Sequence, residues 1–132
     1  MKFLIDTHVL IWILTDTRKL SARTRSLLED YRNQFSVSAV TFWEMAIKIR
    51  TGRLAPVGKW DTAIPYVEQL GFQTIPLLPE EAATVGRLTE ETHFDPFDRM
   101  LIWQAITRGL TLISRDQQFE RFKKDGLKLL WD

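Results

Sequence analysis

The chain has 132 residues, about the length of one domain and enough to bury a core without disulfides. Hydrophobic residues make up 45% and charged residues 27%, which excludes disordered and collagen-like proteins. The net charge is only +1, and the absence of cysteine excludes disulfide frameworks, thiolate zinc sites and cysteine nucleophiles. Apolar runs fall short of the roughly 20 residues that cross a bilayer, and Asp6 and His8 interrupt the one that resembles a signal peptide. We therefore expect a cytoplasmic protein with no membrane partner.

Strand-like and helix-like patterns alternate along the chain. Asp6, Ser21 and Asp95 are suited to cap the helices that follow them, and Pro79 and Pro96 fit the first turn of a helix. In chain order, the expected elements are a strand at 2–5, a helix at 7–14, a helix at 21–32, a strand at 35–38, a helix at 40–50, a helix at 61–70, a strand at 72–75, a helix at 79–91, a helix at 96–108, a strand at 110–113, a short helix at 117–122 and a strand at 127–130.

This alternation predicts an α/β fold in a single domain that spans residues 1–132. We expect a mostly parallel sheet of four to five strands with helices on both of its faces. Right-handed crossovers then bring the carboxyl ends of the strands, and the helix N-termini that follow them, to one edge of the sheet. Ligands of such sheets bind at that edge.

Four acidic residues fall near this predicted edge. Asp6 ends the first strand, Glu44 lies early in the helix after the second, Asp98 is in the first turn of the helix at 96–108, and Asp116 follows the fourth strand. Carboxylates within about 4–6 Å of one another raise each other's pKa values and oppose ionisation. A divalent cation relieves this repulsion, and ligand sets made only of oxygen favour Mg²⁺ or Mn²⁺. The sequence therefore predicts a magnesium or manganese site.

Each acid taken alone also has a structural explanation. Asp6 and Asp116 could be N-caps, and Asp98 could be a first-turn acid that favours the helix dipole, with Asp95 as the cap. Only their joint placement favours a site.

Glu44 could simply pair with Lys48 one helical turn further on. It shares a polar seam with Thr41 and Lys48, opposite an apolar stripe that we expect to face the core. The pattern leaves open whether this seam faces water or a cleft.

Other catalytic and ligand-binding patterns are weak or absent. His8 and His93 could bind a metal ion, but no HxH or HxxxH spacing supports zinc, and a lone histidine is more often structural. Ser114 lacks a glycine-rich elbow, and no glycine-rich nucleotide-binding loop is present. Trp12 and Trp103 lie in apolar helical runs, where packing in a core or an interface is favoured over stacking on bases.

Four segments carry a resemblance to a known family. They are FLIDTHVLIW at 3–12, SAVTFWEMAIK at 38–48, DPFDRMLIWQA at 95–105 and LISRDQQF at 112–119. In order and spacing they resemble the four signatures of the PIN-domain family. More narrowly, they resemble the ribonuclease toxins of bacterial VapBC-type toxin–antitoxin pairs. The resemblance covers nearly the whole chain.

The resemblance assigns roles by position. Asp6, Glu44, Asp98 and Asp116 match the four acids of the family's metal-binding and catalytic site, with Glu44 either binding a second metal ion or orienting a water molecule. Four further residues would support the site. His8 stands where the family often has asparagine or serine, Ser114 keeps the hydroxyl of the usual threonine, and Asp95 is an extra acid that we expect to cap its helix; these three and Thr7 are the supporting residues.

The resemblance also implies a three-layer α/β/α sandwich, a bound Mg²⁺ or Mn²⁺ ion, an RNA substrate, a homodimer and a small antitoxin that blocks the site. Hydrolysis by an activated water would leave a 5′-phosphate and a 3′-hydroxyl. Two other readings remain open. The chain could be a PIN nuclease of RNA processing that has no antitoxin, or a non-catalytic acid-pocket binding domain. A response-regulator receiver is disfavoured, because no aspartate follows the strand at 72–75.

Basic residues suggest where RNA would bind. Without the four clustered acids, the net charge of +1 becomes +5, which favours contacts to a phosphate backbone. Two apolar helices, at 7–14 and 40–49, are either deeply buried or expose a surface for the antitoxin. The residues expected to contact RNA are Arg18, Lys19, Arg23, Arg50 and Arg53.

Overall fold

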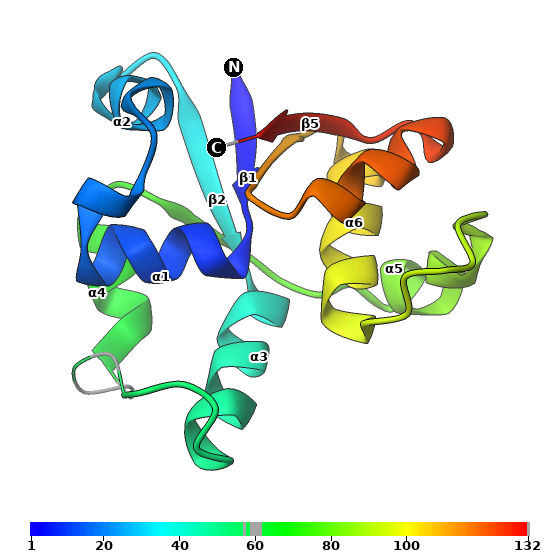
Figure 1. Cartoon of the computed structure of the whole chain (residues 1–132), viewed down its shortest axis with the longest axis horizontal. Helices are drawn as coiled ribbons and strands as arrows, with labels where there is room; N and C mark the ends of the chain where they lie inside the picture. Colours follow the sequence, from blue (N-terminus) through cyan, green and yellow to red (C-terminus); the bar gives the residue numbers. More distant parts are fainter. Residues whose placement is uncertain (57, 59–61, 132) are drawn as a thin grey trace.

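The computed structural model describes residues 1–56, 58 and 62–131. Its centre is a five-stranded sheet in the order β3-β2-β1-β4-β5, and every neighbouring pair of strands is parallel (Figure 1). The predicted parallel sheet is therefore confirmed, and each expected strand is found within about one residue of its predicted bounds. The strands are β1 (Lys2–Ile5), β2 (Gln34–Ser38), β3 (Gln73–Ile75), β4 (Thr111–Ser114) and β5 (Lys128–Trp131).

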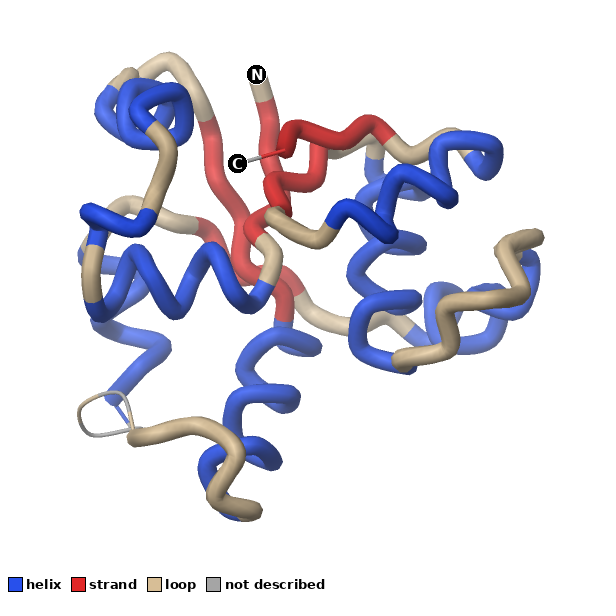
Figure 2. Tube along the Cα trace, viewed as in Figure 1, coloured by secondary structure: helices blue, strands red, loops and turns tan. Residues whose placement is uncertain are grey.

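Helices cover both faces of the sheet (Figure 2). In Figure 1, α1, α2 and α4 lie on one side of the strands, and α5 and α6 lie on the other. This arrangement confirms the three-layer α/β/α sandwich. The α-helices are α1 (Thr7–Thr15), α2 (Ala22–Glu29), α3 (Ala39–Arg50), α4 (Ala63–Gln69), α5 (Pro79–Thr84) and α6 (Pro96–Arg108), and the 3₁₀ segments are η1 (Thr17–Lys19), η3 (Val85–Arg87) and η4 (Gln117–Asp125).

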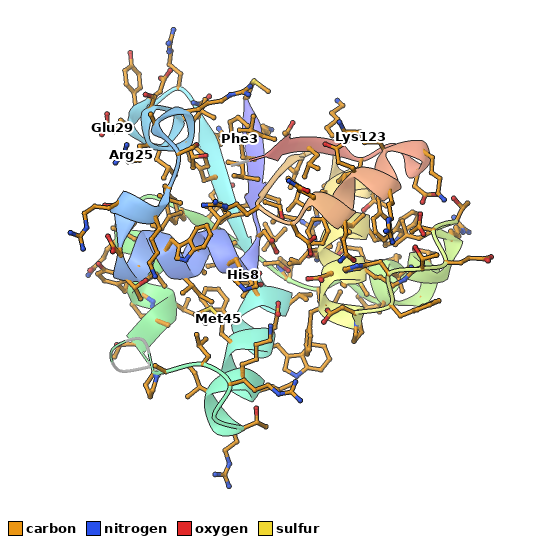
Figure 3. The ribbon with its side chains drawn as sticks, viewed as in Figure 1. Phe3, His8, Arg25, Glu29, Met45 and Lys123 are labelled. Carbon is orange, nitrogen blue, oxygen red and sulfur yellow. The ribbon has the colours of Figure 1, made fainter. Side chains whose placement is uncertain are left out.

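The alternation of side chains along the strands produces two hydrophobic layers. Phe3 and Ile5 on β1 pack with Val9 and Leu10 of α1 on one face. Leu4, between them in sequence, packs on the other face in a cluster with residues of α6 and η4. Figure 3 shows Phe3 on β1 and Met45 on α3, and both belong to the first layer. Burial of each such large apolar side chain contributes about 1.5–3 kcal/mol to folding.

The sheet order places the predicted acidic edge together. β1 is the central strand, with β2 and β4 as its two neighbours. Leu4 pairs with Ser36 on one side and with Leu112 on the other, so the three strands end at the same level. The backbone N–H of Asp6 donates to the carbonyl oxygen of Ile113 at 3.0 Å, which ties the end of β1 to the end of β4. The segments after β1, β2 and β4 therefore begin side by side.

Two predicted helices are too long. The helix expected at 21–32 ends at Glu29, because the Asp30 carboxylate accepts from the backbone N–H and the guanidinium of Arg32 and forms a turn there. The helix expected at 79–91 ends at Thr84 and continues only as one 3₁₀ turn. Beyond that turn the chain is held by distant partners, such as Asp125, which accepts from the N–H of Thr89 at 3.0 Å.

The remaining elements agree with the sequence. The start predicted for the helix at 61–70 lies outside the described residues, and α4 covers Ala63–Gln69. Pro96 occupies the first turn of α6, and Gly109 ends that helix in the left-handed conformation at φ 66°. Within the described ranges, no helix combines the length and the hydropathy needed to cross a bilayer.

Candidate metal centre

Asp6 is the most deeply placed acid at the carboxyl edge. It lies between β1 and α1 and is only 3% exposed. Its Oδ1 accepts from the backbone N–H of Thr7 at 2.8 Å, and its Oδ2 accepts from the hydroxyl of Ser114 at 2.8 Å. Burial raises the pKa of Asp6 to about 6, and the nearby charge of Glu44 adds to this, although the two hydrogen bonds lower it. The side chain is thus oriented by neutral donors that do not cancel its charge.

Glu44 faces the protein interior from α3. It is 3% exposed and Thr41, one turn earlier, is fully buried, so the polar seam that the sequence left ambiguous is turned inward at these two positions. The Thr7 hydroxyl donates to Glu44 Oε1 at 2.7 Å, and Lys48 Nζ donates to Oε2. The predicted pairing of Glu44 with Lys48 is therefore present. Glu44 is nevertheless buried and also bonded to Thr7 of α1, so it is more than a surface ion pair.

Asp98 lies in the first turn of α6, and Asp95 caps that helix. The backbone N–H of Asp98 donates to Asp95 Oδ1 at 2.9 Å, as expected of a cap. Burial and the charges of Asp6 and Asp95 raise the pKa of Asp98 to about 7, against the effect of a hydrogen bond from His93. Glu44 also raises this pKa, so its charge lies close enough to act on Asp98.

Asp116 joins the group from the end of β4. Its backbone N–H donates to the Ser114 hydroxyl at 3.1 Å, and its Oδ1 accepts from the N–H of Gln118 as the N-cap of η4. Ligand atoms of His93, Asp98 and Asp116 all lie within 4.8 Å of one another. Asp6 and Glu44 lie at the same edge, and their charges raise the pKa of Asp98, but among the described residues the group of ligand atoms within 4.8 Å of one another includes neither of them.

His93, which the sequence offered as a metal ligand but favoured as a structural residue, lies in this cluster. Its Nε2 is 2.9 Å from Asp98 Oδ2, and its Nδ1 is 2.9 Å from Gln118 Oε1. Burial lowers the pKa of His93, but the bonds to Gln118 and Asp98 outweigh this effect and raise it. A histidine two residues before the capping Asp95 was the only available signal, and no metal-ligand spacing accompanied it.

His8 occupies a different position from His93. It is an exposed residue at the start of α1 (labelled in Figure 3) and makes no hydrogen bond to the described acids. It borders a depression of about 250 Å³ that Trp12, Arg115 and Asp116 also line. The guanidinium of Arg115 lies 5.0 Å from the centre of the Trp12 ring. His8 therefore lies at the rim of the acidic site.

The basic residues expected to bind RNA are all exposed and lie in two groups. Arg18 and Lys19 are in η1 and Arg23 is in α2, whereas Arg50 ends α3 and Arg53 follows it. Arg18 already forms an ion pair with Asp16 at 2.9 Å. Their contact with RNA remains a prediction.

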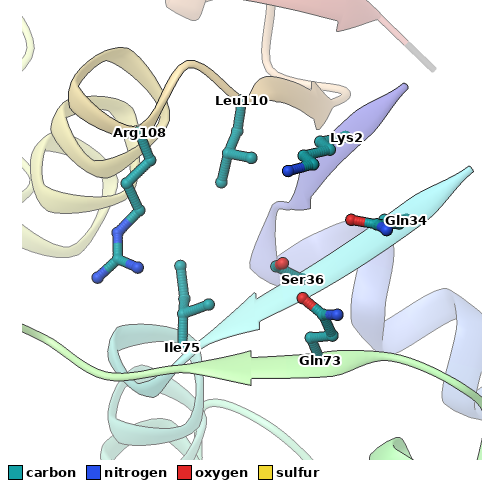
Figure 4. Close-up of a pocket in the computed structure, with 7 residues that line it drawn as sticks. All are labelled: Lys2, Gln34, Ser36, Gln73, Ile75, Arg108 and Leu110. Atoms are coloured by element: carbon teal, nitrogen blue, oxygen red, sulfur yellow. The ribbon is translucent and has the colours of Figure 1, made fainter.

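Two further hollows lie away from the acids. One of about 210 Å³ lies beside the amino-terminal halves of the strands (Figure 4) and is lined by Lys2, Gln34, Ser36, Gln73, Ile75, Arg108 and Leu110. A more apolar one of about 450 Å³ lies between α3 and α4 and is lined by Ala39, Phe42, Ile64, Thr74, Ile75 and Pro76. Neither lining set includes one of the four acids.

The donor set at the acidic edge fits a divalent cation. Ligand oxygens of Asp98 and Asp116 lie within 4.8 Å of each other, and the buried carboxylates of Asp6 and Glu44 lie at the same edge. Oxygen ligands of this kind suit Mg²⁺ or Mn²⁺. The raised pKa values of Asp6 and Asp98 indicate that the protein alone does not neutralise the buried charge. A cation at this edge would restore both acids to their ionised form.

Comparisons with known proteins agree with this geometry. A protein from Mycobacterium tuberculosis (strain ATCC 25618 / H37Rv) named Ribonuclease VapC22 is 26% identical over 133 residues, which cover 97% of each chain. The fold is similar to the crystal structure of VapBC2 from Rickettsia felis, at 15% identity and a TM-score of 0.74 over 100% of both chains. It is also similar to FitAcB from Neisseria gonorrhoeae, at 21% identity and a TM-score of 0.64 over 100% of this chain and 97% of the other.

A family model described as PIN domain matches residues 3–125. This range contains the four predicted acids, Asp6, Glu44, Asp98 and Asp116, and the neighbouring His93. The match covers most of the chain, in agreement with the resemblance of the four sequence segments and with the parallel α/β/α fold. The chain belongs to the PIN domain family.

Proposed function

We propose that this protein is a metal-dependent endoribonuclease that acts as the toxin of a toxin–antitoxin pair, with residues 1–132 forming a single nuclease domain. The observation that carries the proposal is the placement of four acids at one sheet edge, two of them with raised pKa values. The relative from Mycobacterium tuberculosis is named a ribonuclease, and solved structures of similar fold are titled as VapBC proteins. These names support RNA as the substrate and an antitoxin as the partner.

Each acid has a distinct part in this proposal. Asp6, Asp98 and Asp116 would hold Mg²⁺ or Mn²⁺, with Glu44 as a ligand of a second ion or as the group that orients water. When bound, such an ion neutralises charge on the phosphoryl oxygens and activates a water molecule for attack. The Ser114 hydroxyl and the Thr7 N–H hold the Asp6 carboxylate in place, so that little reorientation is needed.

The neighbouring donors act on the acids and not on the substrate. Lys48 and the Thr7 hydroxyl occupy both oxygens of Glu44, which fixes the carboxylate and reduces its repulsion with Asp98. His93 holds Asp98 through Nε2 while Gln118 anchors the other ring nitrogen. Partners of this kind orient metal ligands and tune their affinity for the ion. We therefore assign His93 as a positioning residue of Asp98.

The decisive experiment is to map the ends of RNA cut by the purified protein. Incubation with Mn²⁺ should give fragments with a 5′-phosphate and a 3′-hydroxyl, and a chelator should stop their formation. Ends that carry a 2′,3′-cyclic phosphate would instead mean that the 2′-hydroxyl of the RNA attacks. Sequencing of the ends identifies both the chemistry and the cleavage site.

The toxin assignment needs a separate test, since a PIN nuclease of RNA processing would have the same acids. Expression of the chain should arrest growth, and co-expression of a small protein encoded beside it should relieve the arrest. Gel filtration of the pair should show a complex containing two copies of this chain. Normal growth combined with metal-dependent cleavage in vitro would favour RNA processing.

A further inference from the structure

Two aromatic rings, one exposed and one partly buried, join the helices that carry Glu44 and Asp98. Trp43 on α3 and Phe97 on α6 meet edge to face, with ring centres 4.9 Å apart and planes at 78°. Trp43 is 57% exposed in spite of this contact. We call these two residues the aromatic ledge.

Each residue of the aromatic ledge is the sequence neighbour of one of the acids. Trp43 directly precedes Glu44, and Phe97 directly precedes Asp98. Successive Cα atoms are about 3.8 Å apart, and successive side chains on a helix project about 100° apart. The two acids act on each other electrostatically, and the two rings that precede them are in direct contact. The ledge therefore joins α3 and α6 at the residues that directly precede Glu44 and Asp98.

The exposed surface of the Trp43 ring is available for binding. A tryptophan left in water forgoes much of the stabilisation that its large apolar surface would give on burial, and such surfaces commonly mark binding sites. The contact with Phe97 fixes the orientation of the exposed Trp43 ring, so less conformational freedom is lost when a ligand stacks on it. The ledge is thus a preorganised flat surface.

Basic and apolar residues continue this surface along α3. Ile47 lies one turn beyond Trp43 and is 38% exposed, and Arg50 lies nearly two turns beyond and is also exposed. These positions share one face of the helix. Surfaces that bind single-stranded nucleic acid combine aromatic rings, which stack on bases, with cations that contact phosphates.

We infer that Trp43, supported by Phe97, stacks on an unpaired nucleobase next to the phosphate held at the acidic edge, so that the substrate is single-stranded RNA at the cleavage site. This inference rests on the proposed ribonuclease function and adds a subsite to it. Arg50 would then contact the backbone further along the strand. A duplex could not use the ledge, because its bases are already stacked on one another.

The test is steady-state cleavage of a single-stranded RNA oligonucleotide in Mn²⁺ by three variants. Trp43→Ala should raise KM about 10- to 100-fold, the range expected for the loss of one stacked base, while kcat changes far less. Trp43→Phe should recover most of the loss. Tyr31→Ala is the matched control, since Tyr31 is 94% exposed but precedes β2 at the opposite end of the strands, and it should leave KM unchanged.

Removal of a single base from the RNA provides the second measurement. An abasic nucleotide beside the cleaved bond should raise KM for the wild type but have little further effect on Trp43→Ala, since both changes remove the same contact. If Trp43→Ala cleaves with an unchanged KM, the ledge is not a base subsite. The same holds if the variant loses only the binding of a small partner protein. If the wild type cuts no RNA with any divalent metal, the proposed function itself fails.

Discussion

Two buried carboxylates, on α5 and at the carboxyl edge, have pKa values shifted in opposite directions. Glu81 on α5 is 6% exposed, and Asp6 at the carboxyl edge is 3% exposed. Arg108 donates to Glu81 through Nε at 2.8 Å and Nη2 at 3.1 Å, and Gln104 donates at 3.0 Å. Burial alone would raise the pKa of Glu81, but the bonds from Arg108 and Gln104 outweigh it and hold the pKa at about 2. The pKa of Asp6 is raised to about 6.

The difference lies in the charge of the partners. Both carboxylates accept short hydrogen bonds, but the described side chain that donates to Asp6 is the neutral hydroxyl of Ser114, and its charged neighbours include another acid, Glu44. A buried charge is stable when an opposite charge is built in beside it. The α5–α6 contact carries its own cation, whereas at the acidic edge Lys48 pairs with Glu44 and the described donors to Asp6 are neutral.

Replacement of Asp6 by asparagine should have the largest effect. The amide keeps the size of the side chain but removes the charge that a metal ion requires. We expect RNA cleavage to fall about 1,000-fold, since metal-ion catalysis supplies several kcal/mol and each 1.36 kcal/mol is tenfold in rate. The metal-free protein should become more stable, because a raised pKa means that ionised Asp6 opposes folding. Thermal unfolding without and with Mn²⁺ measures both effects.

Glu91→Gln is the matched control for Asp6→Asn. Glu91 is exposed in the loop before α6 and has no assigned role in the site. It should retain both cleavage and the stabilisation by Mn²⁺. If Asp6→Asn still cleaves RNA at a wild-type rate, the acidic edge is not the catalytic centre.

At the other site, Arg108→Met should destabilise the fold and leave the metal site intact. The change removes the cation from a carboxylate that stays buried, which costs about 3 kcal/mol or more. Arg108 is one-quarter exposed, so part of this cost can be relieved by water. Urea unfolding gives the free energy directly. The double change Glu81→Gln with Arg108→Met should recover much of the loss, and a loss that persists would mean that packing and not charge is responsible.

A smaller effect is expected at His93, which holds Asp98 without replacing its charge. His93→Gln removes the ring that bridges Asp98 and Gln118. Loss of such an orienting partner reduces metal affinity about 10- to 100-fold. Isothermal titration with Mn²⁺ measures the change, and Glu91→Gln, which alters an exposed residue with no assigned role in the site, serves as the control. Equal Mn²⁺ affinities of His93→Gln and the wild type would exclude the positioning role.

The contrast between His93 and the four acids shows what the sequence can reveal. Asp6 and Asp116 follow strands, Asp98 lies in the first turn of its helix, and Glu44 lies in the second turn of the helix after β2. The rule for parallel sheets is therefore enough to place the four acids at the carboxyl edge. His93 lies in a segment whose shape depends on distant contacts. Arg99 Nη1 donates to the carbonyl oxygens of His93 and Glu90 at 2.9 and 2.7 Å, and Asp125 holds Thr89.

The same distant contacts explain the wrong helix prediction at 79–91. Local propensity favours a helix there, with Pro79 at its start and acids in the first turn. The ion pair of Lys124 with Glu90, at 2.9 Å, draws the end of this segment toward η4 instead. A partner 34 positions away leaves no trace in a local pattern, so the sequence predicted the sheet and its acids but missed the loop that carries His93.

The two sites should change the stability of the fold in opposite directions as the pH rises. The pKa of Glu81, about 2 in the folded protein, lies below its ordinary value of 4.5, so its contribution to stability is complete above that value and is lost as the pH falls toward 2. The pKa values of Asp6 and Asp98, about 6 and about 7, lie above their ordinary value of 3.8. The metal-free protein should therefore lose stability as the pH rises from about 4 to 7.

Metal affinity should increase as Asp6 and Asp98 become ionised with rising pH. An acid with a pKa of about 7 is roughly nine-tenths ionised at pH 8 and one-tenth ionised at pH 6, so Mn²⁺ affinity should fall about tenfold between these values through Asp98 alone. Asp98→Asn should weaken binding at every pH and flatten this dependence, leaving the smaller slope due to Asp6. An affinity that stays constant from about pH 5 to 8 would show that protons and the metal ion do not compete for these carboxylates. The difference in pKa between Glu81 and the edge acids would then result from packing and not from the absence of a bound cation.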